Sequence, residues 1–215
     1  EMSSLVTAIF LRSPIEKRTS DIIGNLYLVK FFNKLEDARE FSALINACSR
    51  MDSPHVSLGF CLGNKSFKAE AERIYLSYKQ HLVSALRFVD GSSEKILGKN
   101  YVIINARNNI KDTFVGAVAS ILSHSSVYSE GTIIVTLAYN EDKIKVSARI
   151  VGNEGRNVRD VLHRAVFSFG GEVGGHQNAA GCLISKEQED NFIHELQKVL
   201  ELEPIKINQL HSLNL

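Results

Sequence analysis

A glycine-rich stretch near the end of the chain, FGGEVGGHQNAAGC, carries the residues best suited to bind a ligand. Gly170 can end the preceding helix in a left-handed conformation, and Gly174 and Gly175 leave backbone N–H groups uncovered by side chains. Phosphate is the natural ligand of such a surface, because it is negatively charged and carries several acceptors. A plain turn explains Gly170 but not the second glycine pair, so the residues favour a ligand-binding loop.

His176 and Asn178 follow the second glycine pair, and each has more than one interpretation. His176 can donate a hydrogen bond to phosphate or titrate near neutral pH, whereas an isolated histidine more often satisfies a backbone carbonyl. Asn178 can hold the shape of the loop or contact a base or sugar edge. The clustering of these residues with the glycines makes both of them candidates for the binding site.

The segment KVSARIV upstream has the alternation of a strand, which places Lys145, Ser147 and Arg149 on one face. Arg149 can hold a phosphate through its planar fork of donors, and Ser147 adds a hydroxyl donor. A charged hydrogen bond of this kind contributes about 1.5 to 3 kcal/mol. Without the glycine loop, the solvated outer face of an edge strand is an equally good interpretation.

Arginines continue after this strand, and they can either extend a basic surface or simply be solvated on an amphipathic helix. They are Arg156, Arg159 and Arg164. The six other histidines show no HxxxH or HxH grouping, so no metal site is expected from them. The sequence also contains no G-x-x-x-x-G-K-[ST] phosphate loop and no G-x-S-x-G nucleophile motif.

The composition is that of a folded globular protein. Of 215 residues, 44% are hydrophobic and 23% charged, which excludes a disordered or fibrous chain. The three cysteines are far apart, so neither a disulfide framework nor a zinc site is expected, and the setting is expected to be reducing and cytoplasmic. No apolar stretch is long enough to span a bilayer, so no membrane partner is expected. The net charge of +1 does not by itself imply a nucleic-acid partner.

The first part of the chain is predicted to be mainly helical. Apolar residues recur at helical spacing over residues 34–51, and Ser66 is placed to cap a second long helix. The segment Leu5–Arg12 has the pattern of a strand, whereas the apolar run after it fits either type. Polar turn formers at Asp90–Glu94 interrupt the second helix and mark the expected domain boundary.

After this boundary strands and helices alternate, which predicts an α/β domain with a mixed β-sheet flanked by helices. The expected strands are YVIINA, TIIVTLAY, KIKVSARIV and AAGCLI. Helices are expected to be capped by Asp112, to begin at Asn157 and to open with a capping box at Ser185–Gln188. The predicted organisation is therefore a mainly helical segment (residues 1–94), an α/β domain (95–203) and a C-terminal tail (204–215).

The sequence SAR at Ser147–Arg149, followed by FGGEVGGHQNAAG, resembles the DHH-associated domain of the RecJ branch of DHH-family phosphodiesterases. The signature of that domain is close to S-x-R followed by G-G-x-G-G-H-x-x-A-A-G. The upstream segments REFSALINACSRMDSPHVSLGFCLG and DTFVGAVASIL are similar to archaeal RecJ-like proteins, including the GINS-associated nucleases. The resemblance implies that the chain is the C-terminal part of such a protein.

By this resemblance, the glycine-rich stretch forms one wall of a cleft that holds a phosphodiester against a two-manganese centre. The residues expected on the substrate side are Ser147, Arg149, Gly174, Gly175 and His176. The metal ligands of the family belong to an N-terminal domain with a D-H-H motif, and this sequence has no such motif. We therefore expect this chain to contain no catalytic residue, to bind no metal and to be inactive alone, while the full-length protein uses Mn²⁺ or Mg²⁺.

Three functions are compatible with these features. The first is the substrate-binding part of a single-strand exonuclease of DNA replication or repair, with single-stranded nucleic acid as the partner. The second is a non-catalytic replication scaffold that contacts GINS or the replicative helicase. The third is a phosphodiesterase for cyclic or very short dinucleotides, which needs a closed pocket instead of an open groove.

Overall fold

The structure is a computed structural model that describes residues 24–202, and it divides the chain into two compact units. The boundary lies between Leu76 and Ser77, inside the long helix α4 (Lys65–Gly91). The domain boundary predicted from the sequence, at residue 94, lies after the end of this helix. Polar turn formers can be recognised in a sequence, whereas a helix that contributes to two cores cannot. The predicted strand at Leu5–Arg12 and the tail at 204–215 lie outside the described residues.

The first unit combines a β-hairpin with helices. Its elements are β1 (Leu28–Phe31), β2 (Lys34–Asp37), α2 (Ala38–Arg50), α3 (Pro54–Cys61) and the first part of α4. The helix expected from Lys34 begins at Ala38, because Phe32 and Asn33 adopt positive φ angles and turn the chain into an antiparallel pair. Asp37 ends β2 and caps α2 by accepting a hydrogen bond from the Arg39 N–H at 2.9 Å.

The core of the first unit is built around Phe60 of α3, a helix that periodicity alone does not indicate. Phe60 is fully buried, and its ring lies 5.2 Å from that of Phe31 and 4.7 Å from that of Phe41. Helix α4 begins one residue before the predicted cap Ser66, whose backbone N–H donates to the Asn64 side chain at 3.1 Å. Asn64, and not Ser66, therefore satisfies the start of α4.

The second unit is an α/β domain with a mixed sheet flanked by helices, as predicted, and the sheet has six strands. The strand order is β3 (Ile96–Gly98), β4 (Tyr101–Asn105), β5 (Ile133–Asn140), β6 (Lys143–Ile150), β8 (Ala179–Ser185) and β7 (Val173–His176). Among these six strands, only β4 and β5 pair in parallel. The helices are α5 (Asp112–His124), α6 (Val158–Val166) and α7 (Glu189–Glu201), with short 3₁₀ turns η2 (Phe167–Phe169) and η3 (Lys186–Gln188).

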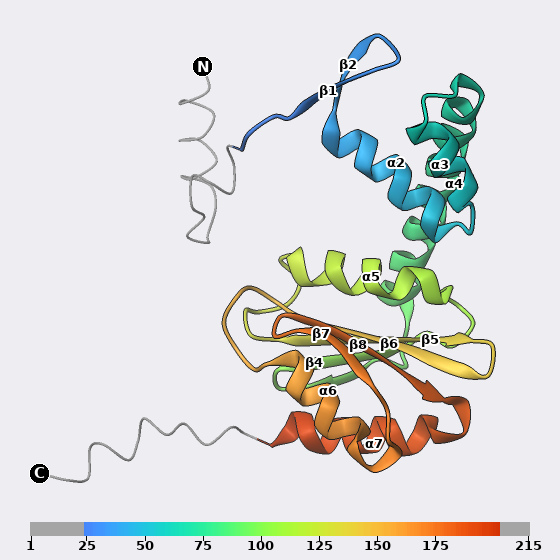
Figure 1. Ribbon diagram of the computed structural model, residues 1–215. Helices are drawn as coiled ribbons and strands as arrows, with labels where there is room; N and C mark the ends of the chain where they lie inside the picture. The colour runs from blue at the N-terminus through green and yellow to red at the C-terminus, as the bar shows by residue number, and fades with distance from the viewer. Residues whose placement is uncertain (1–23, 203–215) are drawn as a thin grey trace, which may run out of the picture. The chain divides into compact units, whose positions relative to one another are not determined.

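The helices cover the two faces of this sheet unequally. Figure 1 shows α5 on one face, with α6 and α7 on the other. The larger core lies between the sheet and the pair α6 and α7, where Val146 and Ile150 of β6 join Leu162 of α6 and Phe192 of α7. Helix α5 packs on the opposite face, against β5 and β6.

Three predicted helix starts differ in how they are capped. Asn157 caps α6 as expected, because its side chain accepts from two backbone N–H groups. Asp112 is the first residue of α5 instead of its cap, and its carboxylate accepts from Asn140 and Lys145 side chains. The predicted capping box at Ser185–Gln188 forms the turn η3 without a side-chain cap, and α7 begins after it.

The glycine-rich stretch is not the loop that the sequence suggested. Gly170 ends η2 with a φ of 66°, as expected, but Val173–His176 form strand β7 at the edge of the sheet. A two-residue turn at 177–178 joins β7 to β8. Two consecutive glycines obscure a strand in a sequence, because they provide neither the alternation nor the β-branched side chains typical of one.

Candidate functional site

The alternation of β6 directs its polar residues toward helix α5. Val146, on the opposite face, belongs to the core with α6 and α7. A Cβ atom placed on Gly116 of α5 would lie 3.6 Å from Ser147 Oγ and 4.0 Å from Arg149 Nη2. Ser147 is only 7% exposed. The polar face of β6 is therefore part of an interior strand that α5 partly covers, and not a solvated outer face of an edge strand.

The Arg149 guanidinium is held above its own strand. Its Nη1 donates hydrogen bonds to the Ser147 hydroxyl at 3.3 Å and to the Ala148 carbonyl at 2.8 Å. Arg149 is half-buried. These contacts fix the guanidinium beside Ser147, two strands away from the glycines of β7.

The register of the sheet places four of the six predicted residues, Ser147, Arg149, Gly174 and His176, in two rows on one face. In the first row, Ser147 pairs with Gly181 of β8, which pairs with Gly174 of β7. Residues that are directly opposite in an antiparallel pair share a face. Across two strand spacings the row is about 10 Å wide, and its two glycines leave it without side chains between Ser147 and the sheet edge.

The second row contains the two titratable or charged candidates. Arg149 pairs with Ala179, which pairs with His176. The only side chain between Arg149 and His176 in this row is thus a methyl group. His176 is exposed, and its Nδ1 accepts a hydrogen bond from the Asn178 N–H at 3.3 Å. A neutral His176 with an accepting Nδ1 carries its proton on Nε2, which can donate to a ligand.

Gly174 and Gly175 differ in what requires them to be glycine. A Cβ on Gly174 would meet nothing within 4 Å, so the surface at this position is open. Gly175 has a φ of 115°, and its Cβ would lie 2.3 Å from the Ala179 carbonyl oxygen. Gly175 pairs with Ala180, which is part of the core on the other face. Gly175 therefore shapes the hairpin, whereas Gly174 belongs to the open floor of the site.

The turn after His176 is tied to the rest of the domain through its backbone. The Asn178 carbonyl accepts from Ile150 N–H at 3.2 Å, and the Gln177 carbonyl accepts from Val158 N–H at 2.8 Å. These bonds join the β7–β8 turn to the end of β6 and to the start of α6. Both bonds are accepted by backbone carbonyls, so the role of the Asn178 side chain stays a prediction.

The arginines after β6 do not extend the candidate surface as a group. Arg156 donates to the carbonyls of Val199 and Leu200, at 2.6 and 2.8 Å, and so caps the C-terminus of α7. Burial, with a smaller contribution from the nearby charge of Arg164, lowers the pKa of Arg156. Arg159 is exposed on α6, on the sheet face opposite α5.

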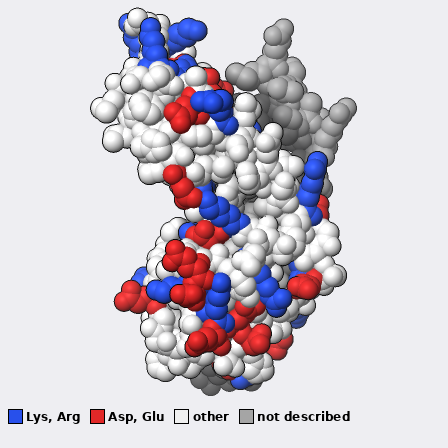
Figure 2. Space-filling model, turned by 90° about the vertical axis from the view of Figure 1, so that its right-hand side faces the viewer, with Lys and Arg blue, Asp and Glu red and all other residues white. Residues whose placement is uncertain are grey.

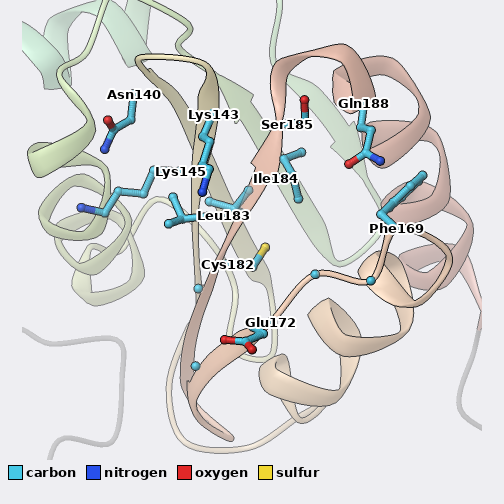
Figure 3. Close-up of a pocket in the computed structure, with 15 residues that line it drawn as sticks. Asn140, Lys143, Lys145, Phe169, Glu172, Cys182, Leu183, Ile184, Ser185 and Gln188 are labelled. Carbon is cyan, nitrogen blue, oxygen red and sulfur yellow. The ribbon is translucent and has the colours of Figure 1, made fainter.

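A pocket of about 680 Å³ adjoins the first row and was not predicted from the sequence. It is lined by Gly174 and Gly181 and extends along β6 and β8 past Lys145 and Leu183 to Lys143 (Figure 3). Of the six predicted site residues, only Gly174 lines it. Lys143 continues the alternation of Lys145 and Ser147 by two more residues, which is the signal in the sequence that could have identified it.

Acidic and basic side chains are interspersed over the second unit in the face shown in Figure 2. Within residues 24–202, no group of three or more His, Cys, Asp or Glu side chains could hold a metal ion. The residues of this part of the chain therefore do not fit a two-metal centre. No helix in the described part is long and apolar enough to cross a membrane.

Comparisons with known proteins agree with this architecture. Residues 98–202 match the family model described as the DHHA1 domain. An uncharacterized protein of Methanocaldococcus jannaschii is 25% identical over 208 residues, which cover 93% of this chain and 42% of that protein. The chain thus spans less than half the length of this curated relative.

Two solved structures show the same fold. RecJ from Thermus thermophilus in complex with Mg²⁺ superposes with a TM-score of 0.58 at 16% identity, over 75% of this chain and 25% of that chain. CDC45 from Entamoeba histolytica superposes with a TM-score of 0.51 at 9% identity, over 81% of this chain and 40% of that chain. Residues 98–202 thus match the DHHA1 domain model, and the fold of the chain is shared with these two solved structures.

Proposed function

We propose that this DHHA1 domain binds the phosphate backbone of single-stranded nucleic acid and presents it to a DHH domain that the chain does not contain. The observation that carries the proposal is the pair of rows on one sheet face. Ser147 and Arg149 lie at one side, His176 lies at the other, and only glycine and alanine lie between them. Such a floor admits a phosphate close to the backbone.

The chemistry of the two rows matches an anionic ligand. Arg149 provides a permanent positive charge and several donors in one plane, and Ser147 adds a hydroxyl. His176 adds an Nε2–H donor on the far side of the floor. Strand β7 lies at the sheet edge, so backbone N–H groups on its outer side are not used by the sheet. Each donor favours phosphate over a neutral ligand.

Hydrolysis would take place outside this chain. Cleavage by two metal ions requires cations about 3.5 to 4 Å apart, held by several carboxylates and histidines. We expect Mn²⁺ or Mg²⁺ to be bound by the DHH domain of the longer protein. The contribution of the domain described here is to bind and orient the strand.

The test is binding of fluorescent, 5′-phosphorylated oligothymidylate to the 215-residue chain, measured by anisotropy at several salt concentrations. We expect Arg149→Ala to weaken binding by about tenfold or more, since a charged hydrogen bond contributes about 1.5 to 3 kcal/mol. Binding should weaken as salt increases, with a slope of about 0.7 per phosphate contacted. Arg159→Ala removes the same charge from α6 and should change affinity by less than about twofold.

Two results would reject the proposal: affinity that does not respond to salt, or equal affinity of the wild-type chain and Arg149→Ala. A replication scaffold with a vestigial cleft predicts either of these results. A phosphodiesterase for very short substrates predicts instead that a dinucleotide binds as tightly as a long oligonucleotide. The series of oligonucleotide lengths therefore separates the three functions.

A further inference from the structure

We infer that the pocket beside the glycine row is a second subsite for the same strand, in which Lys143 pairs with a backbone phosphate further along the nucleic acid. This inference rests on the proposed function. It adds a direction: the strand leaves the Arg149 end of β6 and runs along β6 and β8 toward Lys143. It also predicts that the domain contacts more than one nucleotide.

The first support is the spacing of the polar residues on β6. Lys143, Lys145, Ser147 and Arg149 occupy every second position of one strand and therefore one face. Successive members of this series are about 7 Å apart along the strand. Three of the four are cationic, so this face provides positive charge from the proposed phosphate site to the end of the strand.

The second support is the continuity between the pocket and the candidate phosphate site. Gly174 and Gly181 line the pocket and also form the row that begins at Ser147. The pocket then follows β8 past Leu183 to Ser185, which pairs with Lys143. The pocket and the candidate phosphate site therefore share the floor that Gly174 and Gly181 form.

The third support is the size and lining of the pocket. Its volume of about 680 Å³ lies within the range of roughly 300 to 1,000 Å³ that is usual for small-molecule sites. Leu183, which is 48% exposed, gives the pocket an apolar surface on which a base can pack. Figure 3 shows Lys143 above Leu183, while Gln188 and Ser185 lie toward α7. The combination of apolar surface, amide and cation suits a nucleotide.

The fourth support is the availability of Lys143 as a cation. The ammonium of Lys145 lies 3.5 Å from Asp112 Oδ2 and shares its charge with that carboxylate. Within residues 24–202, the Lys143 ammonium has no ion-pair or hydrogen-bond partner. The pocket also contains the carboxylate of Glu172, which in Figure 3 lies at the opposite end from Lys143. A phosphate would therefore be attracted to the Lys143 end.

The experiment compares thymidine 5′-monophosphate with the 5′-phosphorylated tetranucleotide p(dT)4 by titration calorimetry of the 215-residue chain. Lys143→Gln keeps most of the side-chain length and removes the charge. We expect it to weaken p(dT)4 binding about five- to tenfold and to leave the mononucleotide within about twofold, since only the longer ligand reaches Lys143. The slope against salt for p(dT)4 should fall by about 0.7. Lys143→Arg should restore binding.

Lys198→Gln is the matched control, because Lys198 is an exposed lysine on α7 whose neutralisation changes the net charge by the same amount. It should leave both ligands unaffected. If Lys143→Gln weakens neither ligand, or both equally, while Arg149→Ala weakens both, the second subsite is rejected and the proposed function stands. If Arg149→Ala also has no effect on either ligand, the proposed function fails as well.

Discussion

Adjacent glycines in β7 have different physical reasons to be glycine. Gly175 holds a φ of 115°, where an L side chain is strained, and the carbonyl of Ala179 occupies the space of its Cβ. Gly174 has space around it and lies in the row with Ser147. The hairpin requires Gly175, whereas Gly174 provides the bare floor on which the proposed phosphate site depends.

Gly175→Ala should therefore destabilise the protein. A non-glycine residue in a strained backbone region costs about 1 to 3 kcal/mol, and the contact with Ala179 adds to that cost. The measurement is the free energy of unfolding from urea denaturation followed by circular dichroism. An unchanged midpoint would show that the turn relaxes and that the hairpin does not need glycine at this position.

Gly174→Ala is the matched change one residue earlier, and it should leave the free energy of unfolding within about 0.5 kcal/mol of wild type, as is usual for surface substitutions. Its methyl group would instead lie on the floor between Ser147 and the sheet edge. We expect binding of 5′-phosphorylated oligothymidylate to weaken several-fold. Full retention of affinity by Gly174→Ala would argue against close approach of phosphate to this backbone.

At the scale of elements, Glu189 fixes the start of α7 against the ends of β4 and β5. Glu189 is 9% exposed, and its carboxylate accepts from Asn105 Nδ2 at 2.6 Å, from Arg107 Nε at 3.1 Å and from the Tyr139 hydroxyl. Burial alone would raise the pKa of Glu189, but the hydrogen bonds from Tyr139, Asn105 and Arg107 outweigh it and lower the pKa below its ordinary value. The charged form is therefore the one that the fold stabilises.

This shift predicts a pH dependence of stability with a definite sign. Because the folded-state pKa of Glu189 is depressed, its contribution is complete above the ordinary glutamate pKa of 4.5 and is lost as pH falls through the folded-state pKa. Glu189→Gln should lower the free energy of unfolding at about pH 7 by about 1.5 to 3 kcal/mol. The difference from wild type should shrink as urea denaturation is repeated toward about pH 3.

Glu195→Gln on the same helix serves as the control, since the Glu195 side chain is 38% exposed and in the described structure forms an ion pair with the nearby Lys198. Exposed ion pairs of this kind contribute little. If the difference between Glu189→Gln and wild type is the same at neutral and at acidic pH, ionisation of Glu189 does not contribute to stability and its role is packing alone.

At the scale of the whole molecule, each of the two units has its own core. In the first unit, Phe60 is fully buried among aromatic rings and packs with Leu44 and Val56. In the second, the sheet and helices α6 and α7 enclose a larger apolar cluster. Helix α4 supplies Ala71 to the first core, and its later residue Tyr78 stacks on Phe114 of α5, with ring centroids 5.2 Å apart.

Phe60→Ala should therefore affect the two units differently. Deleting a buried phenyl ring costs about 3 to 5 kcal/mol, and the loss falls on the core that contains it. We expect hydrogen exchange measured by mass spectrometry to accelerate in α2 and α3 while β5 and β6 stay protected. Equal acceleration in the sheet would show that the two units unfold as one cooperative structure.

The sequence alone determined the alternation of strands and helices after residue 94, the two faces of β6 and the resemblance in the S-x-R and glycine motifs. These features are local or periodic, so they are visible without a partner. The helix start at Asn157 and the left-handed Gly170 follow from the same local chemistry. The α/β class and the match to the DHHA1 domain model could therefore be predicted.

Only the tertiary structure decided which residues meet across the sheet. Three such contacts depend on residues far apart in the sequence or on partners without distinctive side chains. Gly174 forms a strand opposite Gly181, Gly116 of α5 approaches Ser147, and Arg156 caps α7. The pocket at Lys143 arises in the same way, because β6 and β8 are brought side by side only by folding. A sequence specifies the face to which a residue points, but long-range packing specifies what that face contacts.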